Sequence, residues 1–462
     1  MLGIVRDFVR GLLPFGLYVT ILWACVSALR GRMVFPIGAI IVCAVLPNLW
    51  YQVHPFPFGK DTTDFLIGSC LLGLLFHKHI VTRSQQSVLL WVYLFYVYLQ
   101  VWNTTLRYGL PLPFSTSNAV LVDFKNYAEM IILYFIAFHS ARDEKTQRQL
   151  LTICMVAYFL IVLREARSFE QTSSDFSYDS RAAGPFWIVG LGANQFAAFV
   201  IHFGAIALAL SFYLENKKER WFLLATSIIA VKPLFFAYSR GAYLAALVVL
   251  LFFGILKKRS LLVLLLVVGI AWQTLLPPSV VSRINTTQNT DGQLESSAAE
   301  RLVLWDKALQ LYSDSPVIGS GLNSFGVSHI AGTWTSVHNL YLQTLAEQGI
   351  VGLAFLVAVI LSAVATGVRL FVKGKTPLEK GLGLGFFGCV LAIIVTNIFG
   401  DRWTYYSTGA LFWIFWGIAD RKLKNHALAK TARAAIPGAS SPRSVELASS
   451  VQVRNAESRQ RA

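Results

Sequence analysis

The sequence predicts an all-α, polytopic membrane protein with about 12 or 13 transmembrane helices and one long, partly helical loop. Two observations predict this class. Of the 462 residues, 55% are hydrophobic and only 14% are charged, whereas about a quarter of the residues in a soluble protein are charged. Apolar runs recur along the chain, and each can cross a hydrocarbon core of about 30 Å, which takes roughly 17–25 helical residues.

The expected spans follow one another through mostly short connections, and the first is read as an uncleaved helix rather than a signal peptide. They cover residues 12–29, 34–51, 64–80, 87–106, 120–139, 149–164, 188–213, 221–238, 241–256, 260–276, 340–372, 382–400 and 403–419. The run over 120–139 carries Asp123, Lys125 and Glu129, so its first half is expected in the membrane interface. Residues 1–420 then form one membrane domain.

The net charge of +16 indicates orientation rather than nucleic-acid binding, because basic residues gather in alternate short loops and at the end of the chain. Such loops stay on the cytoplasmic side of a membrane. The segments between them are then expected outside: 165–187, 239–240, 277–337 and 401–402. Residues 421–462 are basic and lack apolar periodicity, which predicts a disordered cytoplasmic tail or a patch resting on anionic lipid.

The outer segment 277–337 is too long for a simple connection, and loops of that length are usually functional. "SAAE" at 297–300 has the spacing of a capping box. Leu302, Trp305, Leu309 and Tyr312 follow at helical spacing and predict one apolar face. "SDSP" at 313–316 should end that helix, and "GSGLNSF" at 319–325 should form a turn.

Several charges lie where lipid would make them costly, which favours a functional site over a chance position. Arg240 sits in a short break between two apolar runs, and Lys232 lies within the run before it. Arg181 and Arg301 fall in the expected outer segments. For each of them, snorkelling or a solvated surface position is the alternative.

His338 opens the last outer-to-membrane transition, "SVHNLYLQTLAEQG". A neutral imidazole there can accept a proton from a hydroxyl, and a structural, hydrogen-bonding histidine is the alternative. Charge counting places His338 on the same side as the three arginines. Guanidinium binds phosphate in a planar, bidentate fashion, so a diphosphate at the lipid boundary and a hydroxyl acceptor are the expected ligands. The chain has no Asp-x-Asp motif, which favours arginine rather than a metal ion as the phosphate partner.

Four segments, in order, resemble the signatures of the O-antigen ligase and polymerase family: "SRAAGPF…ANQFA", "YSRGAYLA", "RLVLWDKALQLYSDSPVIGSGLNSF" and "SVHNLYLQTLAEQGIVGL". The resemblance covers roughly residues 180–355. It implies a GT-C-like inner-membrane glycosyltransferase that takes a glycan from undecaprenyl pyrophosphate on the periplasmic side. It also implies inversion at the anomeric carbon without metal, ATP or another cofactor. For a ligase, the acceptor is a sugar of lipid A-core.

By the same resemblance, the catalytic residues are His338, Arg240 and Arg301. Arg181 matches a further arginine of the family more loosely, and Glu347 matches its glutamate. Together with Lys232 and Asn339, they are the expected substrate-binding residues. For Glu347, a structural bond to a neighbouring polar group is the stronger expectation.

Other functions remain open from the sequence. A polysaccharide polymerase or a protein O-oligosaccharyltransferase would use the same donor. A lipid-linked glycan transporter is the alternative from a different class, and would be expected to show inverted repeats with interrupted helices. A structural membrane scaffold gives no reason for the position of Arg240.

Overall fold

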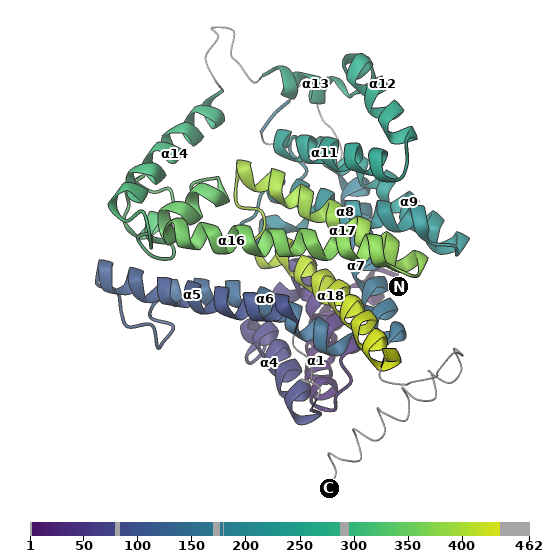
Figure 1. The fold of residues 1–462 in the computed structure, drawn as a ribbon, viewed down its shortest axis with the longest axis horizontal. Coiled ribbons are helices and arrows are strands. Elements are labelled where there is room, and N and C mark those ends of the chain that lie inside the picture. Colours follow the sequence, from purple (N-terminus) through teal and green to yellow (C-terminus); the bar gives the residue numbers. More distant parts are fainter. Residues whose placement is uncertain (1, 79–83, 170–175, 179, 287–294, 435–462) are drawn as a thin grey trace.

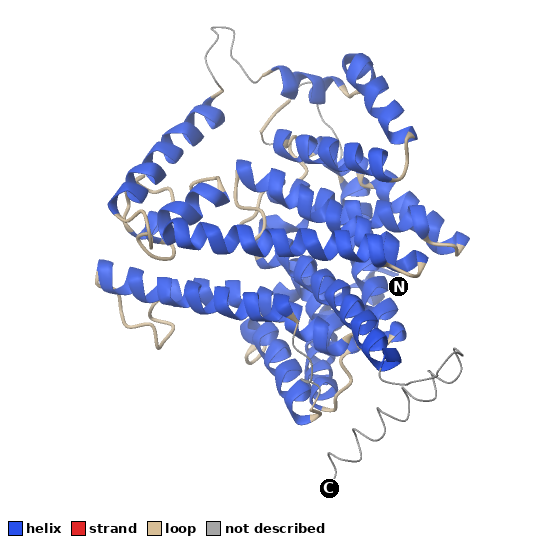
Figure 2. Cartoon of the chain, viewed as in Figure 1, coloured by secondary structure: helices blue, strands red, loops and turns tan. Residues whose placement is uncertain are grey.

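The computed structural model describes residues 2–78, 84–169, 176–178, 180–286 and 295–434, and these residues form helices and no strands (Figures 1 and 2). The α-helices are α1 (Leu2–Leu29), α2 (Val34–Val45), α3 (Pro47–Tyr51), α4 (Thr62–Phe76), α5 (Gln85–Tyr108), α6 (Ala119–Ser140), α7 (Glu144–Ser168), α8 (Ala193–Tyr213), α9 (Lys217–Ile229), α10 (Val231–Phe236), α11 (Arg240–Leu256), α12 (Ser260–Leu275), α13 (Pro278–Asn285), α14 (Ser296–Asp314), α15 (Ser324–Val327), α16 (Leu340–Lys373), α17 (Pro377–Thr396) and α18 (Tyr406–Ala434). Short 3-10 helices cover Gly59–Asp61, Gly184–Val189 and Asn397–Phe399.

Five segments are long and apolar enough to cross a membrane: Leu12–Leu29, Glu144–Ser168, Ala193–Tyr213, Leu340–Lys373 and Pro377–Phe399. The pair α12 and α13, bent by 100°, would make a sixth. Each span expected from the sequence overlaps a helix, but α2 and α11 are shorter apolar helices. The prediction of a helical membrane protein is confirmed, and the number of 12 or 13 spans stays a prediction.

Small residues allow the central helices to pack closely. A Cβ at Gly385 of α17 would come within 2.8 Å of the Cα of Ile206 in α8. In the same way, a Cβ at Gly417 of α18 would meet the carbonyl oxygen of Tyr134 in α6 at 2.5 Å. Helices pack in membranes mainly through such close contacts, because lipid offers no hydrophobic drive for association.

Successive long helices run back and forth, so their connections collect at two ends of the bundle. One end bears the residues between α7 and α8, between α12 and α16, and between α17 and α18. We call it the loop end, and α14 lies there (Figure 1). The opposite end bears the basic connections near Lys217, Lys257 and Lys375. This alternation of basic connections agrees with the orientation predicted from charge.

The C-terminal tail begins later than the sequence predicts. Helix α18 continues through residues 421–434, which corrects the expectation of a disordered segment from 421 onward. Contacts with the bundle hold this part: Asn425 donates to the carbonyl of Arg142 at 2.9 Å, and His426 lies 3.0 Å from Glu379. Residues 435–462 lie outside the described part of the chain.

The outer segment 277–337 contains the expected helix, but two details differ. Helix α14 begins at Ser296, and no side chain caps it, so the predicted capping box of Ser297 and Glu300 does not form. Its buried face is Leu304, Ala308 and Leu311. Leu302 and Leu309, which the sequence placed on one apolar face, are about half exposed. The helix ends at Asp314, before Pro316, as predicted.

Candidate active site

Five arginines from distant parts of the chain surround one cavity of about 420 Å³ at the loop end. We call it the arginine pocket, and its guanidiniums belong to Arg181, Arg240, Arg283, Arg301 and Arg402. They come from the connection before α8, the start of α11, α13, the second turn of α14 and the connection before α18. Tyr178 and Trp305 also line the pocket. The structure thus brings together the three arginines that the sequence singled out and adds two more.

One carboxylate balances part of this charge. Glu295, just before α14, is buried; its Oε2 lies 2.5 Å from Arg240 and its Oε1 lies 2.5 Å from Arg283. Tyr178 donates a hydrogen bond to the same carboxylate. Burial opposes its ionisation, but the bonds from Tyr178 and Arg283 and the charge of Arg240 outweigh burial, so the pKa of Glu295 lies below its ordinary value.

Arg181 and Arg402 are held by neutral groups instead. Arg181 donates to the carbonyl of Ala237 at 2.8 Å and to the amide oxygen of Asn194 at 2.7 Å. Arg402, which is buried, donates to the carbonyls of Asp401 and Phe399 at 3.2 Å. Burial and neighbouring guanidiniums lower the pKa of each to about 10. Both therefore stay protonated at neutral pH, although the neighbouring guanidiniums repel their charge.

Arg301 differs from the other four arginines, because no described residue forms a hydrogen bond or ion pair with its guanidinium. Its Nε is buried and unsatisfied. Burial and the guanidinium of Arg240 lower its pKa, and Glu295 offsets this only in part. A buried polar atom without a partner is costly to stability, and guanidinium is a group that binds anions by charge-assisted hydrogen bonds.

His338 lies beside this pocket, immediately before the N-cap of α16. Its backbone has φ of +56°, a left-handed conformation uncommon for a residue other than glycine. Its ring packs against Trp334 with centroids 5.8 Å apart, and no described residue forms a hydrogen bond with either ring nitrogen. Burial first, and then the charges of Arg402 and Arg301, lower the pKa of His338 to about 4. The imidazole is therefore neutral at pH 7 and able to accept a proton.

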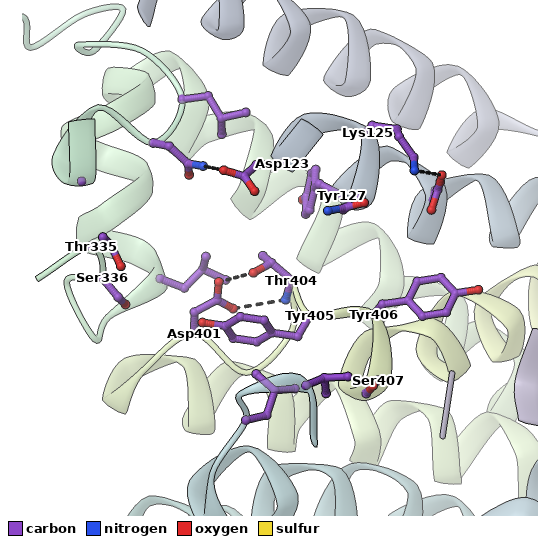
Figure 3. Close-up of a pocket in the computed structure, with 18 of the residues that line it drawn as sticks. Asp123, Lys125, Tyr127, Thr335, Ser336, Asp401, Thr404, Tyr405, Tyr406 and Ser407 are labelled. Atoms are coloured by element: carbon purple, nitrogen blue, oxygen red, sulfur yellow. Dashed lines mark hydrogen bonds and ion pairs between the residues drawn. The ribbon is translucent and has the colours of Figure 1, made fainter. Parts of the chain in front are cut away.

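A second cavity, of about 730 Å³, lies next to the arginine pocket. We call it the acidic cavity, and its carboxylates belong to Asp61, Asp64, Asp123, Glu129, Glu347 and Asp401. Figure 3 shows Asp123 and Tyr127 of α6 across the cavity from Asp401 and Tyr405, with Ser336 at one side.

The two cavities adjoin at one place in the chain, where Asp401 lines the acidic cavity and the next residue, Arg402, lines the arginine pocket. Ser336 also lines the acidic cavity, and its hydroxyl accepts a hydrogen bond from the backbone N–H of His338 at 3.2 Å. His338 therefore lies near both chambers: its imidazole feels the charges of Arg402 and Arg301, and its backbone contacts the lining of the acidic cavity.

Three other residues that the sequence predicted to contact substrate do not line the arginine pocket. Lys232 donates to the carbonyl of Ala166 at 2.7 Å and lines neither chamber. The Asn339 side chain caps α16, accepting from the backbone N–H groups of Tyr341 and Leu342 at 3.0 and 3.1 Å. It thereby fixes the position of His338 rather than facing a ligand.

Glu347 is buried and accepts bonds from the backbone N–H of Asn323 at 3.0 Å and from Gln343 at 3.2 Å. This is the kind of structural bond expected for it from the sequence, although it also lines the acidic cavity.

Sequence reasoning missed Arg283 and Arg402. Arg402 occupies a short polar break between two apolar helices, as Arg240 does, so the argument used for Arg240 applies to it equally. Arg283 lies on the short helix α13 and carried no signal, because only the fold shows that its guanidinium reaches Glu295. Within the described residues, no group of His, Cys, Asp and Glu side chains could hold a metal ion.

The apolar helices define a multi-pass helical membrane protein, and a pocket lined by five arginines lies at one end of its bundle. Residues 225–357 match the model of the O-antigen ligase family, which confirms the family resemblance seen in the sequence. Members of this family are membrane enzymes of the glycosyltransferase type. The matched range contains Arg240, Arg283, Arg301 and His338, whereas Arg181 and Arg402 lie outside it. No curated protein matches the chain significantly.

Proposed function

We propose that this protein is an O-antigen ligase, which transfers a glycan from undecaprenyl pyrophosphate to a sugar hydroxyl of lipid A-core. The observation that carries the proposal is the juxtaposition of the unpaired guanidinium of Arg301 with the neutral imidazole of His338. The first suits a diphosphate, and the second suits a hydroxyl that must lose its proton. The basic connections at the opposite end of the bundle support a periplasmic position for the site in the inner membrane.

In the proposed reaction, the donor diphosphate docks in the arginine pocket. The acceptor oxygen attacks the anomeric carbon from the side opposite the diphosphate and forms the new glycosidic bond. The bond between that carbon and the phosphate oxygen breaks, and undecaprenyl diphosphate leaves with its electron pair. His338 takes the hydroxyl proton. Attack from the opposite face inverts the anomeric configuration.

The guanidiniums stabilise the charge that develops on the leaving diphosphate. Five arginines line the pocket, so their guanidiniums can meet the charge of the diphosphate directly. Arg181 and Arg402 are fixed by carbonyl groups before the ligand arrives. Preorganised charges of this kind do not have to reorient during the reaction.

A reconstituted reaction tests the proposal. Purified protein in sealed lipid vesicles is mixed with an undecaprenyl-diphosphate-linked glycan and lipid A-core, without ATP or an ion gradient. We expect glycan joined to lipid A-core. Movement of the donor across the bilayer without a new glycosidic bond would instead indicate a transporter.

A deletion strain separates the enzymes that share this donor. Long glycan chains that remain on the lipid carrier are expected for a missing ligase. Single repeats on lipid A-core would indicate a polymerase. Loss of glycan from serine or threonine of a secreted protein would indicate a protein O-oligosaccharyltransferase.

A further inference from the structure

We infer that the acidic cavity receives the acceptor saccharide and selects one that is uncharged or amine-bearing, and not phosphorylated or carboxylated, at the sugars it encloses. The inference rests on the proposed function, because it takes the arginine pocket as the place of the donor diphosphate. It adds a charge requirement for the acceptor that the family match does not provide.

The position of the cavity follows from the geometry of displacement. The attacking hydroxyl and the leaving diphosphate must lie on opposite sides of the anomeric carbon. With the diphosphate in the arginine pocket, the hydroxyl must approach from outside that pocket. The acidic cavity adjoins the pocket at Asp401 and Arg402, and Ser336 in its lining accepts a bond from the backbone of His338 at 3.2 Å.

The lining has the chemistry of a saccharide site. Aromatic rings that can cover sugar faces belong to Trp50, Tyr93, Tyr127, Tyr405 and Tyr406. Amide and hydroxyl groups accompany them, among them Asn323, Gln343, Thr335 and Ser336. A ring that presents an apolar face and hydroxyl edges would meet both kinds of group, as in ligand pockets with a few placed polar groups.

The charge of the lining decides which saccharide fits. Six carboxylates and two lysines, Lys60 and Lys125, line the cavity. Even if the buried Glu347 and the largely enclosed Glu129 are counted as neutral, four carboxylates face two lysines. Lys125 is also engaged, at 2.5 Å from Asp64 and 3.3 Å from Glu129.

Asp123 and Asp401 form no ion pair with a described residue, although the charge of Asp401 acts on the neighbouring Arg402. Asp123 accepts a bond from the amide of Asn323 at 2.5 Å, and Asp401 accepts from the backbone N–H groups of Trp403 and Thr404 at 3.1 Å. Charges interact more strongly inside a cavity than in bulk water. A phosphate or uronate beside them would be repelled, whereas hydroxyl and ammonium groups can donate to them.

The side chains that line the two chambers therefore have opposite net charge. The arginine pocket attracts the diphosphate of the donor, and the acidic cavity disfavours it. This difference keeps a donor diphosphate from occupying the acceptor side. It also disfavours acceptors that have a phosphate group on the sugars enclosed by the acidic cavity.

Three matched trisaccharides test the inference by binding alone: tri-N-acetylchitotriose, its amine form chitotriose, and trigalacturonic acid. Binding to the purified full-length protein is measured by saturation-transfer NMR with the arginine pocket filled by inorganic pyrophosphate. We expect the first two to bind at least about tenfold more tightly than the acid. Asp123→Asn should narrow that difference, and Asp314→Asn, at an exposed carboxylate outside both chambers, should not.

Equal or preferred binding of the acid, or no binding of any saccharide, would overturn the inference. Thermal unfolding midpoints verify that both variants are folded. His338→Ala should keep the binding order while losing transfer. If wild-type protein binds in the expected order but never transfers a glycan, the proposed function fails and the assignment of the cavity stands.

Discussion

His338 and Arg402 lie close enough for the guanidinium charge to act on the imidazole, although one precedes α16 and the other follows α17. Burial, this charge and that of Arg301 lower the pKa of His338 to about 4. The sequence predicted a neutral imidazole because of the positive end of the following helix. The same result arises mainly from desolvation and from arginines that only the fold brings near.

Replacing His338 with alanine should lower glycan transfer by at least about 100-fold, since general base catalysis contributes roughly 10² to 10⁴. The variant should insert and fold normally, because the ring forms no hydrogen bond with a described residue. His329→Ala is the matched control: His329 also has a positive φ, of +52°, and lines neither chamber. Substantial transfer by purified His338→Ala would remove the base from the mechanism.

The pH dependence of kcat/KM should reveal the lowered pKa. The free enzyme keeps a neutral imidazole above its pKa, so activity should stay nearly constant from pH 8 to about 5. It should fall as pH passes through about 4. An acid limb centred near 6.5, the ordinary value for histidine, would contradict the environment described for His338. Unfolding midpoints across the same range separate titration from denaturation.

Arg301→Gln should weaken binding of inorganic pyrophosphate by about tenfold to a hundredfold, because a hydrogen bond to a charged group contributes roughly 1.5–3 kcal/mol. Arg301→Lys should recover only part of this affinity, since it keeps the charge and loses the planar fork. Isothermal titration calorimetry measures both.

Arg107→Gln, in an ion pair with Asp314 at 3.8 Å outside the pocket, should bind normally and is the control for the Arg301 variants. Unchanged affinity in Arg301→Gln would show that this guanidinium does not hold the diphosphate.

Glu295→Gln should destabilise the free protein by about 3–5 kcal/mol, the usual cost of leaving a buried charge without its partner. The charge left without its partner in this variant is mainly the guanidinium of Arg283, a residue that is 5% exposed. Pyrophosphate should raise the unfolding midpoint of this variant more than that of the wild type, because the anion replaces the missing carboxylate. An equal rise in both proteins would show that the ligand does not reach Arg240 and Arg283.

The same carboxylate makes stability depend on pH. The pKa of Glu295 is lowered in the folded protein, so its contribution is present above the ordinary value of 4.5 and is lost as pH falls below it. In Glu295→Gln, the wild-type loss of stability below about pH 4.5 should be smaller. Chemical unfolding at pH 6 and pH 4 measures the difference.

Gly349→Ala should destabilise the fold by about 3 kcal/mol. Gly349 has φ of +66° within α16, and an added Cβ would lie 2.3 Å from the carbonyl oxygen of Val317. With ψ of −171°, Gly349 lies in a backbone region that essentially only glycine adopts. The cost combines that strain, roughly 1–3 kcal/mol, with overpacking of roughly 1–3 kcal/mol. Gly332→Ala has the same φ and open space around the Cβ, so it should cost only about the strain. Equal effects in the two variants would contradict the close contact.

The composition and the apolar runs were sufficient to predict a helical membrane protein, because a chain in lipid must satisfy its backbone within helices. A charge between apolar runs singled out Arg240, and positions in the outer segments singled out Arg181 and Arg301; the structure places all three around one cavity. The same reasoning failed for Lys232, whose long side chain reaches a backbone carbonyl instead of the pocket. The spacing that suggested a capping box also misled, since the carboxylate before α14 binds arginines rather than capping the helix.

Local pattern determined which segments of this protein are helical and which charges are out of place, because helix periodicity and the cost of charge in lipid act over a few residues. Only the tertiary structure decided that Arg283 and Arg402 complete the pocket, that Glu295 pairs with two of its arginines, and that His338 lies near Arg402 and Arg301. These are contacts between distant segments. Their energies depend on burial and distance, which the order of residues does not specify.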